Sequence, residues 1–139
     1  MTTEGLGEAE SRISLALFSL RLSVFLVMLM WTLDKFVNWD HTARVYEHFY
    51  LIRGLGSGSF YTIGALEMLL LVGFVIGYQK RLTYGAVFLI HGISTLSSYR
   101  QYLAGFDNLL FFAAWPMLAA CFTLFVLRDM DTRWSVERS

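Results

Sequence analysis

The chain has 139 residues, of which 56% are hydrophobic and 17% aromatic, whereas charged residues make up 16% against about 25% in soluble domains. This composition favours a membrane protein, and the length allows a single domain. Eleven basic and eleven acidic side chains cancel, and no Lys/Arg cluster is present, which argues against a nucleic-acid partner. Cys121 is the only cysteine, so an internal disulfide, a CxxC pair and a cysteine-built zinc site are excluded.

The N-terminal residues 1–12 carry three glutamates and one arginine, which is the opposite of a secretory signal. We predict a mobile tail there. An apolar run follows at about residues 13–33 and is interrupted by Arg21. Because a helix that crosses about 30 Å of hydrocarbon needs about 20 mostly apolar residues, this run is the first predicted span.

The next segment, at about residues 38–53, combines helical periodicity with aromatic residues. Val45, Phe49 and Ile52 recur at helical spacing, and tyrosine and tryptophan residues beside them suit the headgroup zone of a membrane. We therefore predict an interfacial helix between the first and second spans, on the outer side of the membrane.

Three further apolar runs complete a predicted four-helix bundle. They lie at about residues 60–78, 82–98 and 109–127, and a C-terminal tail follows at 128–139. The runs are unbroken, whereas strands of a membrane barrel alternate apolar and polar residues. The predicted fold class is therefore all-α, an integral membrane four-helix bundle with an outer interfacial helix between spans one and two. Pro116 inside the fourth run predicts a kink.

Polar and small residues mark the predicted contact faces of the helices. One face of the first span carries Arg21, Met28, Thr32 and Lys35, and one side of the third carries Tyr84, His91, Ser94, Thr95 and Ser98. Small residues that allow close helix approach are Gly73, Gly77, Gly85 and Gly92.

The loops predict the orientation. Six basic residues fall on the side of both termini and four on the other side: the six are Arg12, Lys80, Arg81, Arg128, Arg133 and Arg138, and the four are Lys35, Arg44, Arg53 and Arg100. The positive-inside rule therefore places both termini in the cytoplasm.

Three ionisable residues at membrane depth form the candidate binding site: Arg21, Glu67 and His91. A charge in hydrocarbon costs at least about 2.5 to 3.5 kcal/mol, so each needs a partner or a function. We predict a buried ion pair between Arg21 and Glu67, with His91 close to it. Two interpretations stay open: a structural network that fixes which helices meet, or a centre that binds the polar head of a quinone or lipid, or passes protons.

Two further histidines, His41 and His48, lie in the interfacial segment. They are seven residues apart, whereas zinc ligands on one helix normally stand three or four residues apart. Solvated polar residues are the preferred interpretation, and a metal site is the alternative. Neither a Ser-His-Asp nor a Cys-His arrangement can be assembled, so no catalytic residue is predicted.

Two motifs give the chain a resemblance to a known family. They are Leu33-Asp34-Lys35-Phe36, which follows Arg21-Leu22 and an apolar run, and Gly64-Ala65-Leu66-Glu67, which is followed by the basic turn Lys80-Arg81. This pattern resembles the DoxX-like family of small membrane proteins. The resemblance implies a four-helix membrane bundle whose recurring polar positions are Arg21, Asp34, Lys35 and Glu67. Family members often carry a proline shortly after the Asp-Lys pair, where this chain has Val37-Asn38-Trp39-Asp40.

The leading functional hypothesis is a small accessory subunit of a larger membrane complex, an oxidoreductase by the resemblance, that aids assembly or shapes a quinone or lipid site. The alternatives are a redox subunit that binds quinone directly through Arg21, Glu67 and His91, and a small transporter or channel. The expected partners are membrane lipid and either a larger complex or further copies of the chain. The expected location is the inner (cytoplasmic) membrane of a bacterium.

Overall fold

The computed structural model describes residues 3–137, and every regular element in that range is helical. Four long helices dominate: α1 (Thr3–Val37), α3 (Ser57–Val75), α4 (Lys80–Ser97) and α6 (Ala114–Val126). The short elements are α2 (Trp39–Val45), the π-helical turn η1 (Tyr46–Tyr50), α5 (Tyr99–Leu103) and three 3₁₀ turns, η2 (Gly105–Asp107), η3 (Leu109–Ala113) and η4 (Arg128–Met130).

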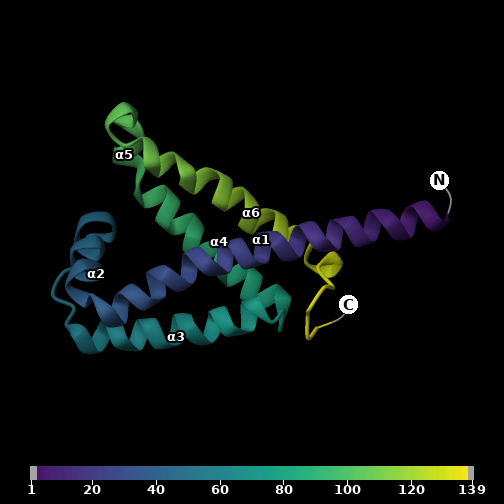
Figure 1. Cartoon of the computed structure of the whole chain (residues 1–139). Coiled ribbons are helices and arrows are strands. Elements are labelled where there is room, and N and C mark those ends of the chain that lie inside the picture. Colours follow the sequence, from purple (N-terminus) through teal and green to yellow (C-terminus); the bar gives the residue numbers. More distant parts are fainter. Residues whose placement is uncertain (1–2, 138–139) are drawn as a thin grey trace.

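The long helices form two antiparallel pairs that cross one another (Figure 1). α3 runs back along α1, and α6 runs back along α4, so the N-terminal and C-terminal ends of the described chain lie at the same end of the molecule. The pairs meet in a core of buried apolar side chains that all four helices supply: Leu17, Val24, Leu71, Val87 and Leu124.

The bundle has two ends, at which the long helices are connected. The tail end comprises the α3–α4 turn at residues 76–79 and the C-terminal residues 128–137, which fold back against it. The loop end comprises residues 38–56, with α2 and η1, and residues 98–113, with α5 (Figure 1).

Three segments are long and apolar enough to cross a membrane: Gly5–Val37, Ser57–Val75 and Leu109–Val126. In the most apolar stretch of each, only 28%, 22% and 11% of the residues are buried by the rest of the chain. Water would solvate such a surface poorly, so these three segments indicate a helical membrane protein whose apolar surface suits contact with lipid. α4 is not among the three, since it begins with Lys80 and Arg81 and contains His91.

The helix bounds differ from the sequence prediction at the N-terminus and in the fourth span. Residues 3–12, predicted as a mobile tail, continue α1, where an ion pair of 3.5 Å between Arg12 and Glu8 joins successive turns. Residues 1–2 and 138–139 of the predicted tails lie outside the described residues. Pro116 stands in the first turn of α6, where a missing N–H costs nothing, and the irregular backbone is the 3₁₀ turn η3 before it.

Three of the four predicted contact glycines do lie where helices approach. A methyl group on Gly73 would meet Thr83 of α4, and methyl groups on Gly85 and Gly92 would meet side chains of α6. Gly77 instead lies in the α3–α4 turn with a φ of +66°, a conformation that favours glycine for backbone reasons.

Candidate functional site

The three residues of the predicted polar centre do not come together. Arg21 lies at the tail end and Glu67 near the loop end, while His91 lies between α4 and α6. The predicted Arg21–Glu67 ion pair is wrong, because α3 runs antiparallel to α1 and brings Glu67 level with Lys35. Arg21 and Lys35 are fourteen residues apart, which is about 21 Å along a helix.

Arg21 is fully buried in a network with Tyr84 and Asp131. Its Nε lies 3.6 Å from Asp131 Oδ2, and its Nη1 donates to the Tyr84 hydroxyl at 3.2 Å. That hydroxyl in turn donates to Asp131 Oδ2 at 2.7 Å, and Arg21 Nη2 donates to the backbone carbonyl of Arg133. The guanidinium therefore joins α1, α4 and the C-terminal tail.

The tail is also tied to the α3–α4 turn by its backbone. The amide of Val136 donates to the Ile76 carbonyl at 2.9 Å, and the amide of Glu137 donates to the Gly77 carbonyl at 3.1 Å. The Glu137 carboxylate accepts a hydrogen bond of 2.8 Å from the backbone amide of Lys80. These bonds close the tail end over Arg21, and they favour the structural interpretation for that residue.

Glu67 belongs to a second polar cluster, which is less deeply buried. Its Oε2 accepts a hydrogen bond from Lys35 Nζ at 2.9 Å and lies 3.1 Å from Thr32 Oγ1, whose single proton it shares with the Met28 carbonyl at 2.8 Å. The Glu67 side chain keeps 17% of its surface exposed and that of Lys35 keeps 7%. Tyr46 of η1 lies nearby, and its burial, together with the Glu67 charge, raises the pKa of its phenol to about 12.

The two sequence motifs behind the family resemblance pack on one another in this cluster. Lys35 pairs with Glu67, and the next residue, Phe36, places its ring against Gly64, where an added methyl group would lie 2.8 Å from the ring. Asp34 turns the other way and binds side chains of α2. Adjacent residues at the end of α1 thus hold α2 and α3 in place. We take the Lys35–Glu67–Thr32 cluster as the candidate site.

His91 connects α4 to α6. Its Nε2 lies 3.1 Å from the carbonyl oxygen of Ala114 and 3.3 Å from the hydroxyl of Thr95. Because a carbonyl oxygen only accepts, Nε2 carries the proton in this arrangement. His91 therefore donates to a backbone carbonyl of α6 and lies apart from both Arg21 and Glu67.

The candidate metal ligands His41 and His48 are held by separate partners. His41 Nδ1 lies 2.7 Å from Asp34 Oδ2 and its ring stacks on Trp31, whereas His48 Nε2 lies 3.2 Å from Gln101 Nε2. Within residues 3–137 no group of three His, Cys, Asp or Glu side chains could hold a metal ion.

Sequence reasoning missed Asp131 and the pairing of Lys35 with Glu67. Lys35 was placed on the correct face of the first span, and Arg21, Met28, Thr32 and Lys35 are all buried as predicted. Comparisons of the chain with protein-family models, with curated proteins and with solved structures found no match. Membership of the DoxX-like family therefore stays a prediction from the two motifs.

Proposed function

We propose that the chain is a small accessory subunit of a larger membrane complex, inserted as a four-helix bundle with both termini on the cytoplasmic side of a bacterial inner membrane. The observation that carries the proposal is the apolar surface of its helices. In the most apolar stretches of the three candidate spans, at most 28% of the residues are buried within the chain. Lipid can cover this surface, and so can the helices of a partner, which pack by shape in a membrane.

The connectivity supports four spans rather than three. α3 ends at the tail end, and α6 begins at the loop end, so α4 has to traverse the bundle between them (Figure 1). α4 keeps its polar groups inside, since Tyr84 and Thr95 are buried. A helix with inward polar groups can cross a membrane when neighbouring helices satisfy them.

The Lys35–Glu67–Thr32 cluster supports the second half of the hypothesis, a site that receives the polar head of a quinone or lipid. The cluster joins the end of α1 to the middle of α3, and Glu67 keeps part of its surface exposed. The assignment of the parent complex as an oxidoreductase comes from the DoxX-like resemblance.

A photo-reactive residue at three exposed positions tests the accessory role: Leu26 on α1, Leu69 on α3 and Phe122 on α6. After illumination in native membranes, we expect cross-links to one and the same protein from one of these faces, identified by mass spectrometry, with the remaining faces as matched controls that label only lipid. A protein that cross-links only to itself and purifies in mild detergent as a homogeneous small oligomer would contradict the proposal.

Direct quinone binding is the second candidate, and the partial exposure of the Lys35–Glu67 pair favours it. Quinone extracted from the purified protein should fall in Glu67→Gln and stay unchanged in His91→Ala, because His91 belongs to a different contact. If no quinone is extracted from the wild-type protein, this candidate is excluded while the accessory role stands.

A further inference from the structure

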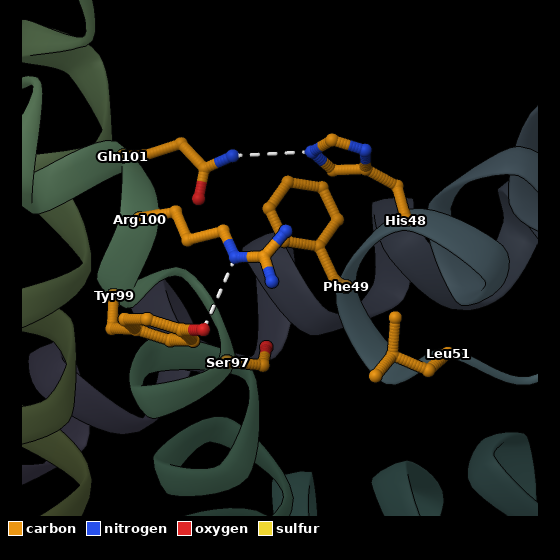
Figure 2. Close-up of a pocket in the computed structure, with 7 residues that line it drawn as sticks. All are labelled: His48, Phe49, Leu51, Ser97, Tyr99, Arg100 and Gln101. Carbon is orange, nitrogen blue, oxygen red and sulfur yellow. Dashed lines mark hydrogen bonds between the residues drawn. The ribbon is translucent and has the colours of Figure 1, made fainter.

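We propose that a hollow at the loop end binds the phosphate group of an anionic phospholipid. The hollow, of about 50 Å³, lies between η1 on one side and the α4–α5 junction on the other (Figure 2). This proposal is independent of the accessory role, because it depends on Arg100 and its neighbours and not on Glu67.

Arg100 supplies the positive charge of the hollow. Its Nε donates to the Tyr99 hydroxyl at 3.1 Å, and its guanidinium carbon lies 5.7 Å from the centre of that ring. Figure 2 shows the guanidinium extending between the two walls toward Phe49. Among the residues that the structure describes, Arg100 forms no ion pair with an acidic side chain. Its planar N–H fork matches the oxygens of a phosphate.

Gln101 adds an unsatisfied polar group beside Arg100. Its Nε2 lies 3.2 Å from His48 Nε2, and its Oε1 is buried without a hydrogen-bond partner. The two ends of a glutamine amide have nearly the same shape, so the amide can turn about its last bond. The oxygen then accepts from His48, and the NH₂ group becomes a donor on the Arg100 side. The rotation exchanges a buried acceptor that has no partner for an NH₂ donor that an anion can satisfy.

The exposed surface of α4, which ends beside the hollow, suits an acyl chain. Leu89, Ile93 and Leu96 are exposed to 64%, 52% and 65% and stand three or four residues apart, so they form one apolar stripe along α4. The stripe ends at Leu96, directly before Ser97, which lines the hollow together with Tyr99 and Arg100 on the other side of the Ser98 break between α4 and α5. A lipid whose chain lies along the stripe would bring its phosphate to Arg100. A free phosphate ion, in contrast, would reach Arg100 without contacting the stripe.

Nanodiscs that contain equal amounts of phosphatidylglycerol and phosphatidylcholine test the proposal. The readout is the ratio of the two lipids that remain bound when the protein is released for native mass spectrometry. We expect Arg100→Gln to lower the bound phosphatidylglycerol about tenfold relative to wild type, because it removes the charge-assisted hydrogen bonds from the guanidinium to the phosphate. The matched control is Arg44→Gln, which removes the same charge from an exposed position of α2 at the same end, and it should leave the ratio unchanged.

A second pair of variants separates a lipid from a free anion. Leu96→Gln should also lower the retained phosphatidylglycerol, whereas Leu69→Gln, on the exposed face of α3, should not. Excess inorganic phosphate should leave the ratio unchanged. The proposal is overturned if the two arginine variants behave alike, or if inorganic phosphate displaces the bound lipid and Leu96→Gln has no effect.

Discussion

The tail end and the loop end each hold a cation–carboxylate pair that starts from α1, but the two pairs differ in burial. The side chains of Arg21 and Asp131 are fully buried, whereas Glu67 in the Lys35–Glu67 pair keeps 17% of its surface exposed. The tail end is sealed by the backbone of residues 133–137, and the loop end is covered only by short helical elements. Two ion pairs on one helix can thus serve different purposes, one holding the chain together and the other remaining within reach of a ligand.

The largest effect is expected from Arg21→Met. Removal of Arg21 leaves the Asp131 carboxylate buried without its ion-pair partner, which costs about 3 to 5 kcal/mol of unfolding free energy. The measurement is the denaturant dependence of unfolding in detergent micelles. The double variant Arg21→Met, Asp131→Leu should recover part of the loss, since it removes both charges. Equal stability of Arg21→Met and wild type would show that the tail end is not sealed from water.

A smaller effect is expected from an alanine at each of two glycines with the same backbone conformation. Gly77 at the tail end has a φ of +66° and Gly54 at the loop end has a φ of +78°, so each substitution carries the strain of a left-handed alanine. At Gly77 the new methyl group would also lie 2.7 Å from Arg21 Nη1, whereas at Gly54 it would meet open space. We expect Gly77→Ala to cost about 1 to 3 kcal/mol more than Gly54→Ala, measured in the same unfolding assay.

The two ends also differ in how far the sequence predicts them. The helical period alone placed Arg21 and Lys35 on one buried face of α1, because side chains three or four residues apart share a face. It could not assign their partners, since these depend on how far α3 is shifted along α1. Asp131 is harder still, because it stands in a tail without helical periodicity, and only the folded chain brings it to Arg21.

Lys35→Met tests the loop end alone. It leaves Glu67 with the Thr32 hydroxyl as its remaining hydrogen-bond partner, and we expect a loss of about 1 to 3 kcal/mol, below that of Arg21→Met because the pair is partly exposed. Thr32→Val is the matched control, since it removes a neutral hydrogen bond to the same Glu67 oxygen and should cost less. A loss as large as that of Arg21→Met would show that the loop end is as structural as the tail end.

The smallest effect is a pH dependence confined to the loop end. The Tyr46 phenol has its pKa raised from 10.0 to about 12 by burial and by the Glu67 charge, so the unfolded chain releases this proton at a lower pH than the folded chain. The stabilising contribution is complete below pH 10 and is lost as the pH rises toward 12. Thermal unfolding of wild type and Tyr46→Phe at pH 7 and pH 11 measures it, with Tyr61→Phe, an exposed position on α3, as the control. The melting temperature of Tyr46→Phe should fall less over this range than that of wild type, and an equal fall would show that η1 leaves Tyr46 open to water.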